Sequence, residues 1–265
     1  MWLVADETRT RRWSQRTDPR TAVRTAVVWE VLDALLAQRA QALGRRLDVV
    51  DVGGGTGGFA VPLAQLGHRV TVVDPSPDAL AALQRRAAEA GVGDAVRPLQ
   101  GDAGGLAALV GAASADAVLC HGVLEYVDDP AAALDDAVAT LRPEGLLSVL
   151  VAQRLGAVLA RALAGRFSDA SRLLDDPSGS AGDGDPLPRR FDQDGLLVLL
   201  AATPVTVQTM HGVRLFTDLL PGALVDGDID SVHSLLELER RTGDHPRHRE
   251  LLALAAQLHV VARRD

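Results

Sequence analysis

The sequence predicts an α/β protein built on a mostly parallel sheet of seven strands. Short runs of β-branched and apolar residues alternate with helical patterns through the middle of the chain. Several of these runs are apolar throughout, as expected of strands that are covered on both faces. A glycine-rich segment joins the first run to the next helix. Alternation of this kind, with right-handed crossovers, gives a parallel sheet with helices on both sides.

The predicted elements up to residue 152 follow a regular order. A long helical pattern comes first, at Thr21–Gln41. Five strands follow, at Leu47–Val52, Arg69–Val73, Val96–Leu99, Ala115–Cys120 and Gly145–Val151. Helices are expected between them, at 59–66, 76–90 and 130–141. Ser76 is placed to cap the second of these helices, and Pro77 to occupy its first position.

Beyond residue 152 the predicted elements are less regular. The last two strands are expected at Pro204–Met210 and Leu258–Arg263, and further helices at Leu155–Gly165 and Phe191–Ala202. Between the last two strands, residues 211–257 are mostly helical in pattern and predict a helical cap. Residues 169–188 are rich in Gly, Ser, Pro and Asp, and predict a mobile loop.

The length of the chain favours one large domain. At 265 residues it is long for one domain and short for two. We expect a single domain over 1–265, in which the sheet occupies the middle. An N-terminal arm and helix at 1–43 precede the core at 44–152, and a C-terminal part follows at 153–265.

Composition favours a cytoplasmic protein without membrane contact. Leu196–Val207 is the longest nearly apolar stretch and is too short to span a bilayer. Met1–Thr10 has no apolar region of the kind that a secretory signal requires. A single cysteine, Cys120, excludes an internal disulfide framework and a cysteine-rich metal site, and we expect no bound metal.

The charge is acidic overall but unevenly distributed. The net charge is −8, and all 27 basic residues are arginines. This total does not favour broad binding to nucleic acid, because affinity for phosphate rises with the number of cations presented. A local basic surface stays open, because six arginines lie in the first segment, at Arg9, Arg11, Arg12, Arg16, Arg20 and Arg24.

The glycine-rich segment after the first strand is the clearest binding motif. Glycines allow a close backbone approach, and the following helix presents unpaired N–H groups to a ligand. Two motifs fit the same residues: Gly53, Gly55 and Gly58 match the dinucleotide fingerprint G-x-G-x-x-G, and Asp51 to Gly57 match D-x-G-x-G-x-G. Asp74, 23 residues after Asp51, is placed to bind ribose hydroxyls in either case. Alone, the segment does not distinguish a nicotinamide cofactor from S-adenosylmethionine (SAM).

The segments that follow favour SAM. Gly101-Asp102-Ala103 follows the third strand, where Asp102 is placed to bind an adenine amino group. CHGVLEYVDDP follows the fourth strand, and LRPEG leads into the fifth. In this order the motifs resemble the class I SAM-dependent methyltransferases. The resemblance implies a Rossmann-like fold with a helical insertion between the last two strands, and S-adenosylhomocysteine as the product of the cofactor.

Four further pieces narrow the resemblance. HGVLEYVDDP (121–130), GVRLFTDLL (212–220), LLELERR (235–241) and LHVVAR (258–263) are similar to the bacterial tRNA 5-carboxymethoxyuridine methyltransferase family. That family esterifies the carboxylate of a modified wobble uridine in tRNA. The resemblance extends from about Arg24 to the C-terminus. It implies methyl transfer to an oxygen acceptor, with tRNA as the leading substrate and a small-molecule metabolite as the alternative.

The resemblance also implies a set of site residues. Arg24 would pair with the methionine carboxylate of SAM, since a guanidinium binds a carboxylate through two hydrogen bonds. The full cofactor-binding set is Arg24, Asp51, Gly53, Gly54, Gly55, Asp74, Pro75, Asp102, Ala103, His121 and Gly122. Plainer roles stay open for two of these residues: Arg24 as a solvated helix arginine, and Asp102 as the N-cap of a helix at Leu106–Val110.

Three residues are candidates for contact with the acceptor. His121 ends the fourth strand, where it can line the cofactor pocket or act as a general base. Arg214 is a candidate for holding an acidic acceptor group, with an ion pair to Asp218 or Glu237 as the alternative. Tyr126, the only tyrosine, is a candidate for stacking on a base or lining the acceptor pocket. We favour a packing role for His121, because an ionised carboxylate needs no base.

Two segments of the sequence differ from the family in ways that bear on which acceptor is methylated. The family has Asn-Ala-His-Gly after the fifth strand, where this chain has Val151-Ala152-Gln153-Arg154. A lysine-rich segment follows in the family, where this chain has five aspartates between 169 and 185, and such a loop is expected to repel phosphates. A non-catalytic SAM-binding protein is the hypothesis of a different class, because a fold does not establish turnover.

Overall fold

The computed structural model describes residues 19–220, 229–243, 245 and 247–265; of residues 19–24, 229 and 230 it describes only the backbone. These residues form two compact units. Unit 1 contains the described parts of Met1–Leu35, Val151–Gly195 and Met210–His259. Unit 2 contains Leu36–Leu150, Leu196–Thr209 and Val260–Asp265. The expected single domain and its subdivisions stay predictions.

Seven strands among the described residues form one sheet, in the order β3-β2-β1-β4-β5-β7-β6. They are β1 (Asp48–Val52), β2 (Arg69–Asp74), β3 (Val96–Gln100), β4 (Ala115–His121), β5 (Leu141–Ala152), β6 (Val205–Val213) and β7 (Gln257–Arg264). The strands from β3 to β5 pair in parallel. Asp265, just after β7, donates its N–H to the oxygen of Pro204, just before β6 (3.1 Å), so β7 runs antiparallel to β6. The predicted mostly parallel, Rossmann-like sheet is confirmed.

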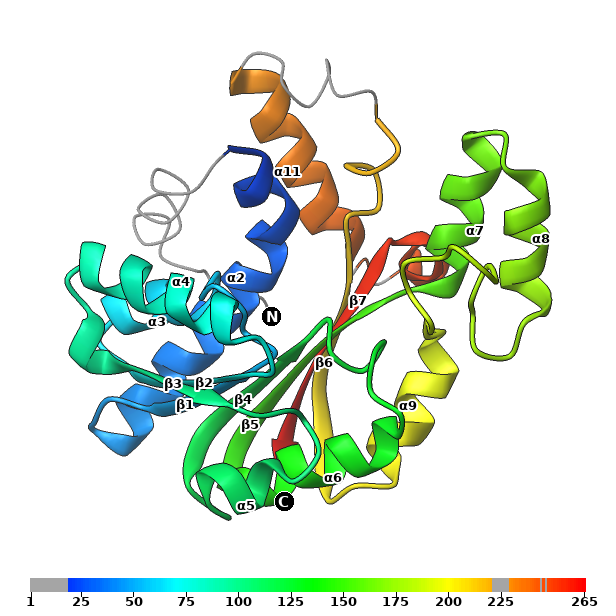
Figure 1. Ribbon diagram of the computed structural model, residues 1–265. Coiled ribbons are helices and arrows are strands. Elements are labelled where there is room, and N and C mark those ends of the chain that lie inside the picture. Colours follow the sequence, from blue (N-terminus) through cyan, green and yellow to red (C-terminus); the bar gives the residue numbers. More distant parts are fainter. Residues whose placement is uncertain (1–18, 221–228, 244, 246) are drawn as a thin grey trace. The chain divides into compact units, whose positions relative to one another are not determined.

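Helices cover both faces of the sheet in unit 2. In Figure 1, α3 (Ala60–Gln65) and α4 (Pro77–Glu89) lie over one face, and α5 (Leu106–Val110) and α6 (Pro130–Thr140) over the other. The start of α4 agrees with the prediction, because the Ser76 hydroxyl accepts the N–H of Ala79 (3.2 Å). The strands between these layers are almost fully buried, which places the core along β1, β4 and β5.

The remaining elements belong to unit 1, or have residues in both units. Helix α2 is Pro19–Leu43 and α9 is Gln193–Ala201; α7 is Arg154–Leu163, α8 is Phe167–Asp175, α11 is Ile229–Gly243, and the 3-10 helix η2 is Arg249–Leu254. Within unit 1, Arg240 of α11 holds Glu30 of α2 through two hydrogen bonds of 2.7 and 2.8 Å. No helix in the described part of the chain is long and apolar enough to cross a membrane.

The segment expected to be a loop at 169–188 begins with regular structure. Residues 169–175 belong to α8, which pairs with α7 as a helical hairpin. The rest is tied to its own end, because Arg190 binds the two carboxylate oxygens of Asp185 at 2.6 and 2.8 Å. Arg190 also donates to the oxygen of Gly179 (3.0 Å). The helical part of the expected loop is therefore a correction, and its mobility stays a prediction.

Gln153 gives a structural reason for the departure at 151–154. Its amide nitrogen donates to the oxygens of Leu252 (2.9 Å) and Ala255 (2.7 Å), and its own N–H donates to the oxygen of Ala256 (2.9 Å). The side chain is buried, so it satisfies two carbonyl groups that water does not reach. Gln153 thereby joins the end of β5 to the segment that precedes β7.

We expect Gln153→Leu to destabilise the protein by about 2 kcal/mol, because two buried carbonyl groups lose their donor. Leucine keeps much of the side-chain volume, so the loss reflects hydrogen bonding rather than a cavity. Chemical denaturation measures the change in the free energy of unfolding. Gln208→Leu, at an exposed position of β6, is the control. Equal stabilities of the two variants would contradict the structural role of Gln153.

Candidate functional site

The glycine segment turns sharply between β1 and α3. Gly53, Gly55 and Gly57 all have positive φ angles (64°, 53° and 83°), which residues with a side chain adopt at a cost. A Cβ atom on Gly54 would lie 2.5 Å from Oδ2 of Asp51, so the turn also passes directly over this carboxylate. Both constraints exclude larger residues. The loop therefore brings bare backbone to the carboxyl end of β1, the edge at which open parallel sheets bind ligands.

Asp74 at the end of β2 holds this loop in place. Its Oδ2 accepts the N–H of Gly55 (2.9 Å), and its Oδ1 accepts the N–H of Ser76 (2.9 Å). The side chain is buried, so both bonds are shielded from water. Each carboxylate oxygen can accept more than one hydrogen bond. Asp74 is thus oriented by the protein and retains capacity for the hydroxyl groups of a ligand.

Asp51 is a buried carboxyl beneath the same loop. It is 2% exposed, and its Oδ2 has no hydrogen-bond partner. Burial, and to a smaller extent the neighbouring Asp74 carboxylate, raise the pKa of Asp51 to about 7. A site with two adjacent carboxyl groups and one unsatisfied buried oxygen is suited to a ligand that is both cationic and rich in hydrogen-bond donors.

The residues after β3 lie at the same edge of the sheet. Ala103 is buried, whereas the Asp102 side chain is exposed. Helix α5 has Gly105 as its N-cap, and the N–H of Gly105 donates to Asp136 (2.5 Å). The alternative role of Asp102 as the cap of this helix is therefore wrong. After β2, Pro75 is exposed and its carbonyl accepts the side-chain amide of Gln100 (3.3 Å). Ligand contacts for Pro75, Asp102 and Ala103 stay predictions.

His121, at the end of β4, is held as a neutral imidazole. Its Nε2 lies 2.8 Å from the hydroxyl oxygen of Ser148 on β5, and its ring packs edge-on against Phe59 with a centroid separation of 4.7 Å. Burial lowers the pKa of His121 to about 3. The next residue, Gly122, has a φ of 67° and donates its N–H to the oxygen of Leu150 (2.8 Å). At neutral pH His121 is therefore uncharged and a weak base, in keeping with a packing role.

Cys120, which precedes His121 in the chain, and Glu125 are two further buried side chains. Both are 2% exposed. Burial, followed by the negative charges of Glu125 and Asp51, raises the pKa of Cys120 to about 12. Because a thiolate is the reactive form, Cys120 is not a nucleophile at neutral pH.

Three further sequence-predicted residues have other surroundings or lie outside the described side chains. Tyr126 follows β4 but its side chain is 60% exposed. Arg24 lies in α2, where only its backbone is described, so its side chain is outside the described residues. Arg214 belongs to unit 1, where it pairs with Asp218 at 3.2 Å. The structure therefore shows the alternative ion pair of Arg214 with Asp218.

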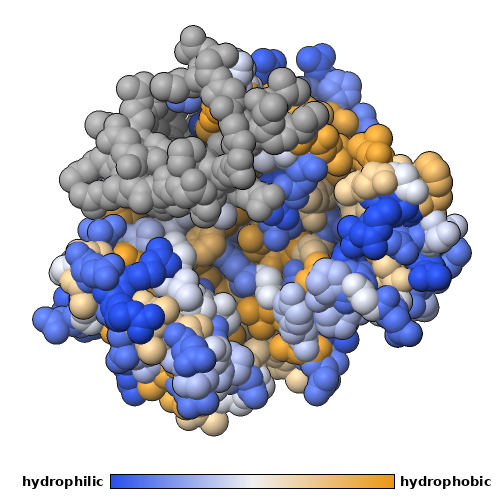
Figure 2. Space-filling model, turned by 45° about the horizontal axis from the view of Figure 1, so that its top comes forward, coloured by the Kyte–Doolittle hydropathy of each residue, from blue (hydrophilic) through white to orange (hydrophobic). Residues whose placement is uncertain are grey.

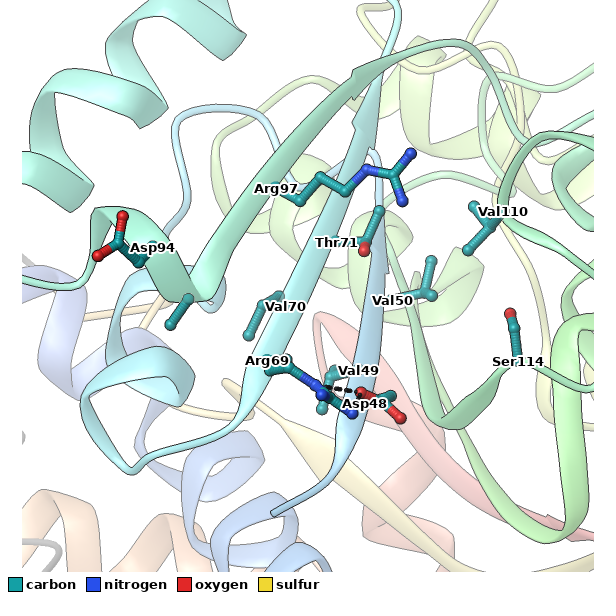
Figure 3. A pocket seen from close by; sticks show the side chains of 11 residues that line it. Asp48, Val49, Val50, Arg69, Val70, Thr71, Asp94, Arg97, Val110 and Ser114 are labelled. Carbon is teal, nitrogen blue, oxygen red and sulfur yellow. Dashed lines mark hydrogen bonds and ion pairs between the residues drawn. The ribbon is translucent and has the colours of Figure 1, made fainter.

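A pocket of about 430 Å³ opens at the opposite ends of the strands. Figure 3 shows Asp48 and Arg69 in its wall; these first residues of β1 and β2 form an ion pair of 2.5 Å. The glycine segment, by contrast, follows the last residue of β1. Because ligands of parallel sheets bind outside the carboxyl ends of the strands, we do not assign this pocket to a cofactor.

The arrangement in unit 2 combines a glycine turn, two carboxyl groups and a neutral histidine at one sheet edge. Two of its members were not expected: Ser148, which orients His121, and Phe59, which packs on its ring. Ser148 is recognisable in retrospect as the single polar residue in the apolar run GLLSVLV. Among the residues that the structure describes, no group of three or more His, Cys, Asp or Glu side chains is placed to hold a metal ion.

Comparison with known proteins agrees with this geometry. Residues 50–149 match the family described as "Methyltransferase domain". The tRNA 5-carboxymethoxyuridine methyltransferase of Escherichia coli is 30% identical over 244 residues, which cover 91% of this chain and 88% of that protein. A ubiquinone biosynthesis O-methyltransferase of Methylocella silvestris is 38% identical, over 45% of each chain. The structure of a magnesium protoporphyrin IX methyltransferase from Synechocystis with bound S-adenosylhomocysteine superposes with a TM-score of 0.57 at 17% identity, over 99% of this chain and 95% of that one.

Proposed function

The chain belongs to the family of SAM-dependent methyltransferases that includes the tRNA 5-carboxymethoxyuridine methyltransferase of Escherichia coli, and we propose that it methylates a carboxylate oxygen on a modified tRNA uridine. The observation that supports this acceptor is the extent of the similarity. The E. coli enzyme matches 91% of the chain, whereas the ubiquinone biosynthesis enzyme matches only 45%. The wider match includes residues outside the methyltransferase-domain match at 50–149.

The residues of unit 2 fit the cofactor. When bound, SAM supplies an electrophilic methyl group on a positively charged sulfur. Asp74 is oriented to accept the ribose hydroxyls, and the glycine turn lets the ligand approach the backbone closely. Asp51 offers a buried, unsatisfied oxygen, and a cationic ligand favours its ionised form. The family resemblance adds Asp102 at the adenine and Arg24 at the methionine carboxylate.

The chemistry proposed needs no general base. A carboxylate acceptor is already ionised at neutral pH, and the low pKa of His121 makes this imidazole a poor proton acceptor. Catalysis then depends on holding the acceptor oxygen in line with the methyl group and the departing sulfur. Exclusion of water strengthens the attraction between the anionic acceptor and the cationic sulfur. Ser148 and Phe59 hold His121 as part of the site wall.

The aspartates at 169–185 do not form an unbalanced acidic surface. Residues 154–192 contain six arginines and six aspartates. Asp169 pairs with Arg166 at 2.5 Å, and Asp185 pairs with the buried Arg190 at 2.6 Å. The segment is therefore close to neutral, which weakens the expected repulsion of a phosphate backbone.

The surface of the α7–α8 hairpin mixes charge and apolar area. On the right of Figure 2, where this hairpin lies in Figure 1, strongly hydrophilic and apolar residues adjoin. Leu163 and Phe167 are 66% and 71% exposed, and the side chains of Arg166 and Arg172 are also exposed. Arginine beside an exposed aromatic ring is a combination that single-stranded nucleic acids recognise by stacking and charge. This surface is thus compatible with an RNA acceptor.

The test supplies the protein with methyl-labelled SAM and two acceptor pools. One pool is tRNA from E. coli cells that lack their own 5-carboxymethoxyuridine methyltransferase; the other is a small-molecule cell extract. We expect label in the tRNA that mild alkali releases as methanol, because a methyl ester hydrolyses under conditions in which methyl ethers and N-methyl groups persist. Alkali-stable label would contradict a carboxylate acceptor.

The other outcomes identify the alternatives. Label confined to the small-molecule pool would favour a metabolite methyltransferase, in keeping with the partial similarity to the ubiquinone biosynthesis enzyme. Label in neither pool, together with SAM binding measured by calorimetry, would favour a non-catalytic SAM-binding protein.

A further inference from the structure

The loop after β6 contains a strained residue. Arg214 has a φ of 59°, in the left-handed region that residues other than glycine seldom adopt. Such a conformation costs about 1–3 kcal/mol and persists only where the surroundings enforce it. Strained residues of this kind cluster at functional sites, so the groups that enforce the conformation are of interest.

Glu239 of α11 is the group that holds this loop. Its carboxylate accepts three consecutive backbone N–H groups, those of Leu215 (2.8 Å), Phe216 (2.9 Å) and Thr217 (2.8 Å). It also accepts the hydroxyl of Thr217 (2.7 Å). Glu239 is 3% exposed, so these four bonds to an ionisable group are shielded from water. Successive N–H groups that converge on one anion form a nest, and here the anion is a side chain of the protein itself.

The other charged residues of α11 have different partners. Glu237 is exposed and binds Arg240 (2.8 Å), and Arg240 also binds Glu30 of α2. Each hydrogen bond described for the Glu239 carboxylate goes to the loop that begins directly after Arg214. Glu237 and Glu239 thus have different roles on one helix. Glu237 belongs to a surface ion-pair cluster, and Glu239 holds the loop.

Arg214 is fixed on both sides of its strained bond. Its carbonyl accepts the N–H of Ala256 (3.3 Å), and the residue that follows it is bound to Glu239. Its guanidinium contacts Asp218 at 3.2 Å and is about one-fifth exposed. A planar guanidinium binds carboxylates through paired hydrogen bonds, and Asp218 shows that this one accepts a carboxylate partner.

We propose that Glu239 is a positioning residue that presents Arg214 to the carboxylate of the acceptor. The inference rests on the proposed function, since it requires an anionic acceptor. Glu239 itself does not touch the acceptor: its carboxylate is occupied by the loop, and its effect passes through the backbone of Leu215 to Arg214.

The experiment compares Glu239→Gln with Glu237→Gln in the full chain, using the same E. coli tRNA and labelled SAM. The amide that replaces the Glu239 carboxylate is a weaker acceptor and turns N–H groups toward N–H groups, so the loop loses its anchor. For Glu239→Gln we expect the KM for tRNA to rise about tenfold, the loss of roughly one hydrogen bond to a charged group. The SAM dissociation constant is expected to stay unchanged. Glu237→Gln is expected to keep the wild-type KM.

Two further variants distinguish positioning from folding. Glu239→Asp keeps the charge and should recover part of the KM. Thr217→Val removes only the hydroxyl bond and should raise the KM in the same direction by less, which keeps the proposal testable where Glu239→Gln does not fold. A folded Glu239→Gln variant with a lowered melting temperature but the same KM as Glu237→Gln would overturn the proposal. Glu239 would then stabilise the loop without affecting the acceptor. If the wild type fails to put alkali-labile label into tRNA, the proposed function itself fails.

Discussion

Asp74→Ala is expected to abolish measurable binding of SAM. The carboxylate of Asp74 accepts the N–H groups of Gly55 and Ser76, so its removal releases the glycine turn and the start of α4 together. It also removes the acceptor proposed for the ribose hydroxyls. Loss of two or more hydrogen bonds to a charged group predicts a rise of about 10²- to 10⁴-fold in the SAM dissociation constant. Isothermal titration calorimetry with SAM and S-adenosylhomocysteine measures it.

Two controls make this result specific. Asp78→Ala removes an exposed carboxylate from the first turn of the same helix and should leave SAM affinity unchanged. Asp74→Asn keeps the shape of the side chain, retains one acceptor oxygen and should give an intermediate loss. An Asp74→Ala variant that binds SAM with wild-type affinity would remove Asp74 from the cofactor site and place recognition elsewhere.

The order of the elements in the first half of the chain could be predicted because each has a local signal. Ser76 and Pro77 start α4 as expected. Strand β5 differs: it begins at Leu141 rather than Gly145, because the turn-forming residues lie inside an irregular part of the strand. Its register with β4 shifts between Leu141 and Leu146, and Glu144 has a φ of 64°. Local turn chemistry predicts a break there, whereas pairing with β4 extends the strand across it.

The site residues that could be predicted are those that directly follow a predicted strand. Asp51, Asp74 and the glycines follow strand ends, and a parallel sheet gathers strand ends at one edge. Ser148 and Glu239 act through contacts with residues 27 and 22 or more positions away, which no local pattern specifies. A weak signal exists for Glu239, since it lies four residues after Leu235 and three after Leu236, on the apolar spacing of its helix.

Helix α8 illustrates a different limit. Asp, Ser and Gly after residue 168 predict a loop by composition, yet residues 167–175 are helical. Leu173 is fully buried and Ala170 nearly so, at a helical spacing of three. Packing against α7 thus overrides a composition that disfavours helix on its own.

Asp51→Asn is expected to stabilise the free protein at pH 8. It is also expected to remove the pH dependence of SAM binding. The folded-state pKa of Asp51 is about 7, above its ordinary value of 3.8, because burial and Asp74 disfavour the charge. The folded state therefore retains a proton that the unfolded state loses, and stability falls as the pH rises from about 4 to 7, by at most about 1.4 kcal/mol per pH unit. Asparagine carries no charge, so the variant avoids this loss.

The measurement is the melting temperature of the free protein from pH 4 to 8. Wild type and Asp51→Asn should agree near pH 4, and the variant should melt several degrees higher at pH 8, since about 1 kcal/mol corresponds to 2–4 °C in a chain of this size. Asp94→Asn, at an exposed position before β3, is the control and should follow the wild type. A variant that melts below the wild type at pH 8 would show that the Asp51 carboxylate is satisfied in the free protein.

SAM binding should show the opposite preference. The cationic ligand favours ionised Asp51, so binding to the wild type releases a proton below pH 7, and the affinity should rise about tenfold from pH 6 to 8 for a group with a pKa near 7. Asp51→Asn should lose this dependence, and any titration of SAM itself remains in both curves and cancels in their difference. The nearby Asp74, Cys120 and Glu125 are retained in both proteins. A carboxyl that costs stability when empty and gains a partner when SAM binds is a functional residue rather than a structural one, and parallel pH curves for the two proteins would refute this.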